Sequence, residues 1–400
     1  MSRPLRVALL GSRGIPANYG GYETLMEEVA TRLAAGAWSS TASPTSAEGS
    51  TVDAERFTDV ERLTDAELEV TVYCRAHHTP KALRDYRGVR LVVLPTLRTK
   101  FFDTPVHTFL SCLHAALRGR FDAALVVNSA NAVFVPILRL GGIPTALHVD
   151  GIEKKRAKWG PFGRAVYALS ERLACVVPSV LVTDAEVIRD HYRRRYGADS
   201  WMITYGVDPV PPSETGVLER LGLEPRRYFL YVSRFEPENN PHRVVEAYRE
   251  VGGDLPLVMV GSAPYAGDFI EAFKRRADAR VLFPGGIYGD GYRELLSGAL
   301  AYIHATEVGG THPALVEAMG YGNCIVVNDT PENVEVAGEV GFPFQAPEPA
   351  SLAAVLDRIR ENPGLARQRG DAAARRAQER FSWPSVTARY AELLTTMATG

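Results

Sequence analysis

The chain has 400 residues, of which 46% are hydrophobic, and a formal net charge of −2. This length favours two or three domains, and the near-neutral charge argues against a nucleic-acid partner. The four cysteines are scattered without a CxxC pair or metal-ligand spacing, which is typical of reduced thiols in a cytoplasmic protein. No apolar run reaches the length of a membrane span, and because an apolar strand starts at Leu5 we expect no signal peptide.

Apolar runs and amphipathic segments alternate along the first half of the chain. Strands are predicted over residues 5–10, 68–74, 89–94, 123–127, 144–151 and 180–183, with helices between them. Two helices are amphipathic, with apolar faces formed by Leu25, Val29, Ala30 and Leu33 in the first and by Val166, Leu169 and Leu173 in the second. This alternation indicates a parallel α/β sheet. Residues 37–65 lack periodicity and are rich in Ser, Thr, Ala, Pro, Gly and acids, so we expect a disordered insertion there.

A glycine-rich loop follows the first strand, where doubly wound sheets open a binding site at their carboxyl edge. The loop spans residues 11–24 and is much longer than the GxGxxG turn of a dinucleotide-binding fold, which argues against a dinucleotide site. Gly20 and Gly21 allow the backbone to approach a sugar or a phosphate closely.

A cationic run follows the strand at 144–151. Lys154, Lys155 and Lys158 are half of the six lysines in the chain, and Arg156 lies among them. Such a run is ordinarily a solvated loop. Its place after the carboxyl end of a strand supports a binding role as well, and both interpretations stay open.

The proline-rich stretch at 209–216 is the clearest domain boundary. After it the alternation starts again, with strands predicted over 228–233, 257–261 and 281–286 and a helical tail from residue 349. Two successive α/β units joined by a short linker are expected to form an interdomain cleft.

Residues 299–329 combine a strand, a glycine-bearing turn, a helix and a second strand. Gly309 and Gly310 lie in the turn, Thr311 can cap the helix, and Pro313 suits its first turn. A helix N-terminus after such a turn is a good phosphate site. Glu317 lies just beyond the first helical turn, where its carboxylate can accept a hydrogen bond from a sugar hydroxyl. The alternative is an ordinary βαβ unit in which Glu317 is merely solvated.

Five sequence blocks occur in an order that resembles the retaining glycosyltransferases of family 4, in particular a bacterial rhamnosyltransferase-like subgroup. They are GSRGIP at 11–16, YGGYET at 19–24, DGIEKKRAKW at 150–159, EPENN at 236–240 and VGGTHPALVEAMG at 308–320. The resemblance covers nearly the whole chain except the insertion. It implies the GT-B fold, an α/β architecture of two Rossmann-like doubly wound domains facing across a cleft. The expected parts are an acceptor domain over 1–205, a nucleotide-sugar donor domain over 206–380 and a C-terminal helix over 381–400 that crosses back to the first domain.

The resemblance also implies roles for single residues. The donor diphosphate is expected to bind Arg234 and the amides of Gly309, Gly310 and Thr311, and its ribose is expected to bind Glu317. The family's sugar-contacting His aligns with Asp150, and His148 is close by, so both are candidate catalytic residues together with Arg234. Gly20 and Gly21 are expected to bind the donor. The acceptor is expected to contact Tyr22, Glu153, Arg156 and Lys158.

Two positions depart from the family pattern. The first Glu of the family's paired-Glu motif falls at Gly309, with Glu307 two places early. The Lys that accompanies Arg234 in the family falls at Asn239, which is kept as a donor-binding candidate.

The resemblance implies transfer of a sugar, with rhamnose as a candidate, from a nucleotide diphosphate to a hydroxyl of a glycan or lipid-linked acceptor. No DxD pair is present, so we expect a metal-independent reaction without a cofactor. The cationic run suggests an anionic membrane surface as a further partner. The alternatives are a nucleotide-sugar epimerase or hydrolase on the same fold, and a non-catalytic nucleotide-sugar-binding protein.

Overall fold

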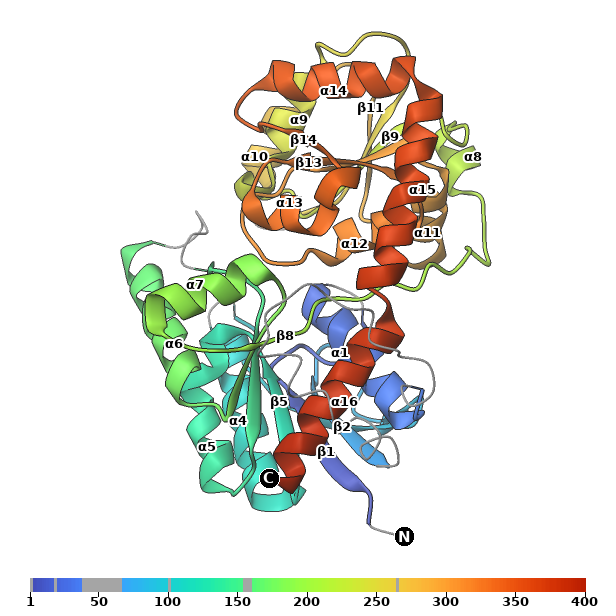
Figure 1. The fold of residues 1–400 in the computed structure, drawn as a ribbon. Helices are drawn as coiled ribbons and strands as arrows, with labels where there is room; N and C mark the ends of the chain where they lie inside the picture. Colours follow the sequence, from blue (N-terminus) through green and yellow to red (C-terminus); the bar gives the residue numbers. More distant parts are fainter. Residues whose placement is uncertain (1–2, 18–19, 38–66, 100–101, 154–159, 264–265) are drawn as a thin grey trace. The chain divides into compact units, whose positions relative to one another are not determined.

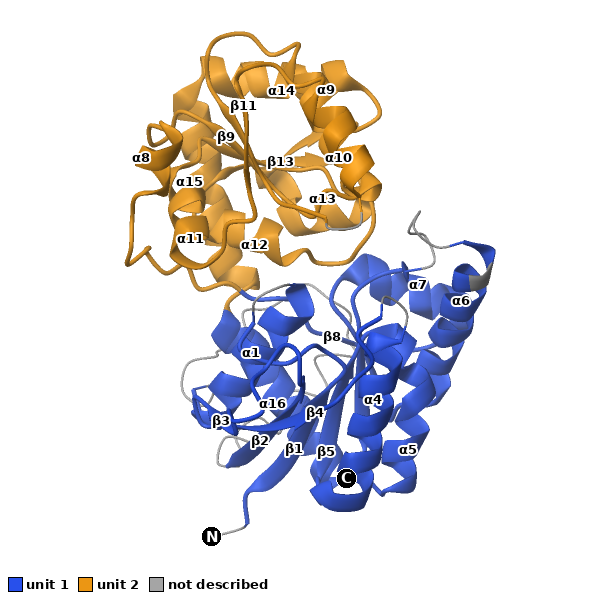
Figure 2. Cartoon of the chain, turned by 180° about the vertical axis from the view of Figure 1, so that it is seen from behind, with its two compact units in different colours: residues 1–154, 160–206, 383–400 blue, residues 155–159, 207–382 orange. Residues whose placement is uncertain are grey.

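The computed structural model describes residues 3–17, 20–37, 67–99, 102–153, 160–263 and 266–400. The expected insertion at 37–65 lies outside these ranges except for its first residue, and so do Arg156 and Lys158. The chain divides into two compact units (Figure 2). Unit 1 extends to Gly206 and includes the C-terminal Trp383–Gly400, and unit 2 comprises Val207–Ser382.

The core of unit 1 is a single sheet. Its strands are β1 Leu5–Leu10, β2 Leu68–Arg75, β3 Asp85–Tyr86, β4 Val89–Leu94, β5 Ala123–Val127, β6 Thr145–Val149, β7 Val180–Thr183 and β8 Trp201–Met202. Within the described residues, their order in the sheet is β3-β4-β2-β1-β5-β6-β7-β8, and all neighbours are parallel except β3 and β4. The predicted strands at 5–10, 89–94, 123–127 and 180–183 are confirmed at both ends.

Helices cover both faces of this sheet (Figures 1 and 2). They are α1 Gly21–Ala34, α4 Asp103–His114, η2 Ala115–Gly119, η3 Ser129–Phe134, α5 Val135–Leu140, α6 Pro161–Val176, α7 Glu186–Tyr196 and α16 Trp383–Thr399. Side chains of β1 alternate between the two layers. Val7 and Leu9 share a core with α1 and α16, whereas Ala8 and Leu10 share the other core with α4, α5, α6 and α7. The apolar face predicted for α1 is confirmed, because all four of its residues are buried.

The apolar face predicted for α6 is wrong at two of its three residues, because only Leu173 packs partly against the core. Val166 and Leu169 are exposed, and the buried side chains of this helix include Ser170, Glu171 and Ala174. The buried face is therefore turned away from the apolar stripe, and Glu171 is held there by a 2.8 Å hydrogen bond from the hydroxyl of Tyr196. A local pattern cannot anticipate this arrangement, because the polar partner comes from the next helix.

Unit 2 is built around a parallel sheet. Its strands are β9 Phe229–Val232, β10 Leu257–Val260, β11 Val281–Gly285, β12 Ala301–His304, β13 Cys324–Asn328 and β14 Phe342–Phe344. Their order is β11-β10-β9-β12-β13-β14. The helices of unit 2 are α8 Val217–Leu221, η5 Pro237–Asn239, α9 Pro241–Tyr248, α10 Gly267–Lys274, α11 Gly289–Gly298, α12 Pro313–Gly320, α13 Pro331–Ala337, η6 Gly338–Val340, α14 Pro349–Glu361 and α15 Pro363–Arg380. One core contains residues of α9, α10 and α14, and the other contains residues of α8, α11, α12 and α15.

The strand order of each sheet reverses at one point. In unit 2 the chain moves from β9 through β10 to β11 on one side and then returns to place β12 on the other side of β9. In unit 1 the corresponding neighbours are β1 and β5. The loops that leave the carboxyl ends of the two strands diverge at such a point, so a ligand crevice is expected at these two places.

Candidate functional site

The carboxyl ends of β9 and β12 bring two loops of unit 2 together. The backbone N–H of Glu307 donates to the carbonyl of Glu238 over 2.9 Å. The side-chain amide of Asn240 donates to the Ala305 carbonyl and to Glu307 Oε1, each over 2.9 Å. Asn240 has a φ of 57°, a left-handed conformation that Asn adopts more readily than most residues. The loop after β9 and the loop before α12 therefore form one hydrogen-bonded unit.

Arg234 lies at the start of this arrangement, just after β9. Its side chain is 44% exposed, and its Nη1 is 3.6 Å from Glu236 Oε1. The guanidinium thus lies at the carboxyl edge of the sheet with most of its hydrogen-bonding groups directed away from the core. A planar guanidinium in this position suits two oxygens of a phosphate.

Asn239 has a structural task in the same loop. The residue is buried, its Nδ2 donates to the Arg234 carbonyl over 2.7 Å, and its own carbonyl accepts from the Tyr231 hydroxyl over 2.8 Å. Where the family pattern has a second cation, this chain has a neutral amide that fixes the backbone beside Arg234. Arg234 is therefore the cation that the loop after β9 offers at this edge of the sheet.

The turn before α12 is closely packed. Gly309, Gly310 and Thr311 are buried, and a Cβ added at Gly309 would lie 2.4 Å from Cε1 of His312. The His312 ring lies against the ring of His304, with centroids 4.7 Å apart and the planes tilted by 51°. The family pattern has Glu at the position of Gly309. In this chain the His312 ring fills the space next to Gly309 that a side chain there would occupy.

The N-terminus of α12 differs from the expectation in one respect. The capping residue is His312 and not Thr311, and no side-chain hydrogen bond caps the helix. The first-turn N–H groups keep the orientation that suits an anion.

Glu317 is half-buried on α12 and is oriented by a neighbouring helix. Its Oε2 accepts a 2.7 Å hydrogen bond from the hydroxyl of Tyr292 on α11. Burial first, and then the Glu317 carboxylate, raise the pKa of Tyr292 well above its usual value, so the phenol stays a hydrogen-bond donor. Sequence reasoning missed Tyr292, and its spacing from Glu317 carries no signal because the contact joins two separate helices.

In unit 1, the loop after β1 leads into α1 beside Asp150. Gly20 is the extended N-cap residue of α1 and Gly21 is its first residue. Tyr22 follows, and burial, then the charge of Asp150, raise the pKa of its phenol well above the usual value. Burial, then the charge of Asp150, also raise the pKa of the Tyr205 phenol well above the usual value. Asp150 is therefore flanked by two neutral phenols at the carboxyl end of β6.

His148 lies deeper than Asp150. The residue is fully buried, its Nδ1 is 2.6 Å from the hydroxyl of Tyr390 on α16, and burial lowers its pKa to about 3. The neutral imidazole thus joins β6 to the C-terminal helix within unit 1. This position suits a structural contact, whereas the half-exposed Asp150 and Glu153 remain at the carboxyl edge.

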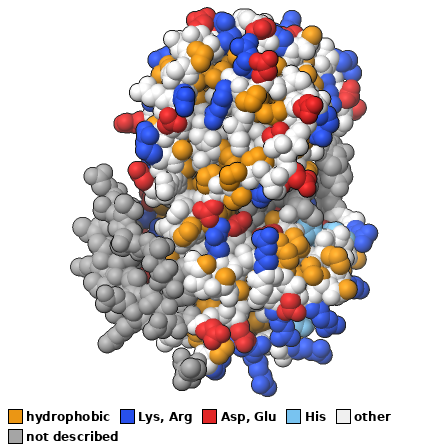
Figure 3. Space-filling model, turned by 90° about the vertical axis from the view of Figure 1, so that its right-hand side faces the viewer, with side chains coloured by type: hydrophobic (Ala, Val, Ile, Leu, Met, Phe, Trp, Pro, Cys, Tyr) orange, Lys and Arg blue, Asp and Glu red, His pale blue; other side chains and the backbone are white. Residues whose placement is uncertain are grey.

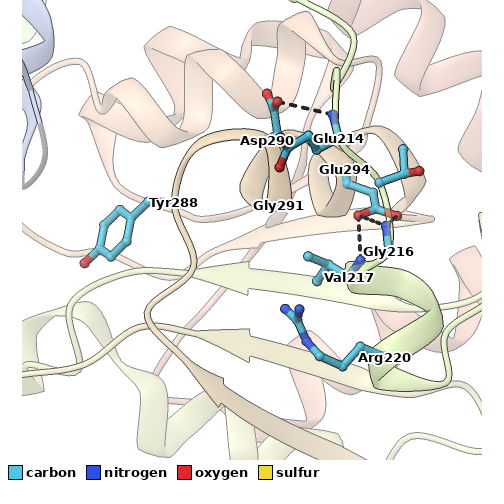
Figure 4. A pocket seen from close by; sticks show the side chains of 9 residues that line it. Glu214, Gly216, Val217, Arg220, Tyr288, Asp290, Gly291 and Glu294 are labelled. Carbon is cyan, nitrogen blue, oxygen red and sulfur yellow. Dashed lines mark hydrogen bonds between the residues drawn. The ribbon is translucent and has the colours of Figure 1, made fainter.

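A separate cavity of about 300 Å³ lies in unit 2 (Figure 4). It is lined by Glu214, Thr215, Gly216, Val217, Arg220, Tyr288, Asp290, Gly291 and Glu294. The Glu294 carboxylate accepts hydrogen bonds from the N–H groups of Gly216 and Val217 over 2.9 and 2.7 Å. These contacts fix the start of α8 against α11, and none of the residues predicted for the site lies in this cavity.

Comparison with known proteins agrees with the architecture. Residues 219–376 match the family model "Glycosyl transferases group 1". The chain is similar to the solved structure of the Anabaena protein HepE in complex with UDP-glucose, with 15% identity, a TM-score of 0.74 and coverage of 98% of this chain and 100% of that chain. It is also similar to sucrose-phosphate synthase from Thermosynechococcus elongatus, with 17% identity, a TM-score of 0.76 and coverage of 98% and 99%.

A glycosyltransferase from Rickettsia africae gives a TM-score of 0.70 at 13% identity and covers both chains completely. No curated protein matches the chain. The structural likenesses establish the fold, which is GT-B with two Rossmann-like α/β domains. The family match places a glycosyltransferase domain over most of unit 2, and the protein is accordingly an enzyme of the glycosyltransferase class.

Proposed function

We propose that the protein is a retaining glycosyltransferase that moves a sugar from a nucleotide diphosphate to an acceptor hydroxyl. The observation that carries this proposal is the hydrogen-bonded pair of loops at the carboxyl ends of β9 and β12. They hold a guanidinium, a glycine turn with a helix N-terminus, and an oriented carboxylate on one edge of unit 2. The guanidinium and the amides suit a diphosphate, and the carboxylate suits the hydroxyls of a ribose.

Each group has a distinct task in this proposal. Arg234 binds the diphosphate and neutralises the charge that develops when the diphosphate leaves. The amides of Gly309, Gly310 and Thr311 complete the phosphate site at the start of α12. Glu317, held by Tyr292, accepts hydrogen bonds from the ribose hydroxyls. Asn239 positions Arg234 through the hydrogen bond from its side-chain amide to the Arg234 carbonyl. HepE, which shares the fold, has been solved with UDP and with UDP-glucose, and this supports a nucleotide-sugar donor.

The proposed chemistry is a substitution at the anomeric carbon that retains configuration. The bond from that carbon to the diphosphate oxygen breaks, and the acceptor oxygen forms the new bond on the same face of the sugar. The acceptor's proton passes to a diphosphate oxygen. No cofactor takes part, and because the sequence has no DxD pair, the leaving charge is assigned to Arg234 and the amides.

Unit 1 is assigned to acceptor recognition. Asp150 is the candidate for contact with the transferred sugar, Gly20 and Gly21 border the donor sugar, and Tyr22 and Glu153 border the acceptor. Arg156 and Lys158 complete this proposed surface, although both lie outside the described residues. Rhamnose, and a glycan or lipid-linked acceptor, are proposed from the sequence blocks shared with the rhamnosyltransferase-like subgroup. All four cysteines are unpaired, which supports a location in the reducing cytoplasm.

A panel of nucleotide sugars, incubated with and without lipid-linked and glycan acceptors and with and without EDTA, tests the proposal. Mass spectrometry detects the product, and proton NMR of the purified product gives its anomeric configuration. Product that requires both donor and acceptor, carries the donor's anomeric configuration and forms in EDTA supports it. Donor turnover without any acceptor would identify an epimerase or hydrolase instead. Donor binding by calorimetry without turnover of any donor–acceptor pair would contradict the proposal and identify a binding protein. This arm is included because Gly309 and Asn239 stand where the family pattern has charged residues.

A further inference from the structure

One face of unit 1 is a continuous helical layer formed by α4, η2, η3, α5 and α6, here called the α4–α6 layer (Figures 1 and 2). The rings of Phe109 and Phe134 join α4 to η3, with centroids 6.2 Å apart. Nη1 of Arg139 on α5 donates to the carbonyl of Val177 at the end of α6 over 2.9 Å. These contacts make the layer one surface.

The outer side of this layer carries a group of exposed apolar side chains. Exposed hydrophobic side chains that occur singly are ordinary on a soluble protein, but a group of them on one surface marks a binding site. The exposed apolar side chains of the layer are Phe109, Leu113, Leu117, Val133, Leu140, Val166, Leu169 and Val176. Val166 and Leu169, two of the three residues predicted to form the packing face of α6, belong to this outer group.

The three most exposed of these side chains lie at one end of the layer. Leu117, Leu140 and Val176 are 74%, 90% and 70% exposed, and they lie near the carboxyl ends of η2, α5 and α6. These helices lead into the neighbouring strands β5, β6 and β7, so their ends meet at the amino edge of the sheet. A Cβ added at Gly141, next to Leu140, would lie 2.8 Å from Cβ of Ala116, next to Leu117, which shows that η2 and α5 touch there.

The charge on this layer has one sign. The exposed basic residues on or next to these helices are Arg118, Arg120, Arg139, Arg164 and Arg172. The acidic residues of the same helices are Asp103, which is 19% exposed and bonded to Arg75, and Glu171, which is 2% exposed. Figure 3 views the molecule from the side opposite to this layer in Figure 1, and acidic and basic side chains are interspersed there.

We propose that the α4–α6 layer is a docking surface for an anionic lipid bilayer. Aliphatic side chains enter the boundary between headgroups and acyl chains, and the surrounding guanidinium groups pair with lipid phosphates. A second copy of the chain fits poorly, because a two-fold contact across this face would set Arg against Arg with no exposed acid of the layer to compensate. In the described part of the chain no helix is long and apolar enough to cross a membrane, so the attachment is peripheral.

Vesicle co-sedimentation with the full-length protein tests this proposal. Vesicles of phosphatidylcholine with phosphatidylglycerol are compared with vesicles of phosphatidylcholine alone, at low and high salt. The apolar variant is Leu117→Ser with Leu140→Ser, and the charge variant is Arg118→Glu with Arg172→Glu. The matched control makes the same kinds of change on unit 2, Val210→Ser with Arg367→Glu, at two exposed positions. Thermal unfolding checks that every variant is folded.

The wild type and the control are expected to sediment with the anionic vesicles and to be released by salt. The apolar variant should bind the anionic vesicles about tenfold less than the wild type does. The charge variant should lose about tenfold or more. Equal binding of wild type and both layer variants would overturn the proposal. So would loss of binding only on Lys154→Glu with Lys155→Glu, because the cationic run would then be the docking segment. If the wild type is a dimer in solution and both layer variants are monomers, a second copy covers the layer and the proposal is overturned. These readouts need no nucleotide sugar, so they are independent of the proposed transfer reaction.

Discussion

The Tyr292 hydroxyl donates a 2.7 Å hydrogen bond to Glu317 Oε2, and this contact joins α11 to the helix that carries the proposed ribose ligand. Tyr292 is partly buried and lies beside the carboxylate, so the bond orients the Glu317 side chain before any nucleotide binds. Preorganisation of this kind favours ligand binding, because less side-chain freedom is lost when the complex forms.

We therefore expect Tyr292→Phe to weaken nucleoside diphosphate binding by about tenfold, since a hydrogen bond to a charged group is lost. Glu317→Gln should weaken the same binding while thermal stability changes little. In a double-mutant cycle measured by calorimetry, the combined variant should lose less than the sum of the two, because both changes act on one contact. Tyr228→Phe is the control, since its hydroxyl donates to a backbone carbonyl, that of Leu295. Full additivity, or unaltered affinity in Tyr292→Phe, would contradict the assignment.

Arg234→Ala should lower donor affinity and turnover together, by on the order of a few kcal/mol in the free energy of the transition state. Arg234→Lys should recover only part of this loss, because an ammonium cannot contact two phosphate oxygens in the same plane. Steady-state kinetics with the active donor measures both. Arg249→Ala, at an exposed position after α9, is the matched control. Kinetics of Arg234→Ala that equal those of the control would remove Arg234 from the site.

Gly309 and His312 are expected to depend on one another. A side chain at position 309 must displace the His312 ring, since an added Cβ would lie 2.4 Å from its Cε1. Gly309→Ala should destabilise unit 2 by about 1–3 kcal/mol through overpacking. Gly309→Ala combined with His312→Ala should regain most of this loss in denaturant titrations. If the double variant is no more stable than Gly309→Ala alone, the steric account is incorrect.

The buried His148 should make folding stability depend on pH. Burial lowers its pKa to about 3 from about 6.5 in the unfolded chain, so its contribution is complete above about pH 6.5. As the pH falls below that value the unfolded state binds a proton and the folded state does not. Stability should then fall by about 1.4 kcal/mol per pH unit for each such histidine, down to the folded pKa. Burial also lowers the pKa of His107 to about 4 and of His304 to about 3, so they add to the effect.

Denaturant titrations between about pH 6.5 and 5 measure this slope. His148→Gln should reduce the slope by about 1.4 kcal/mol per pH unit, the contribution of one proton. Tyr390→Phe keeps the buried imidazole and should keep the slope, while the lost hydrogen bond costs about 1–3 kcal/mol at neutral pH. A slope that is the same in His148→Gln and in the wild type would show that His148 is not held neutral in the folded protein.

Much of the architecture could be predicted from local patterns. The bounds of β5 agree with an apolar run of five residues, and those of β1 with a run of six that is apolar except for Arg6. A buried parallel strand is apolar on both faces, so it can be recognised without knowledge of a distant partner. The burial of one face of α1 followed from its helical spacing in the same way. The order of strands and helices indicated two α/β units, and the turn before α12 indicated an anion site.

The sequence by itself thus determined the elements, the fold class and the place of the proposed phosphate site, since each depends on residues that are close together in the chain. Only the tertiary structure decided which side chains meet. It turned α6 so that Val166 and Leu169 face outward, set Tyr292 against Glu317, and buried His148 against Tyr390, 242 residues away. Such contacts follow from the packing of whole helices against a sheet, where burial and hydrogen bonding are satisfied jointly, and no local spacing encodes them.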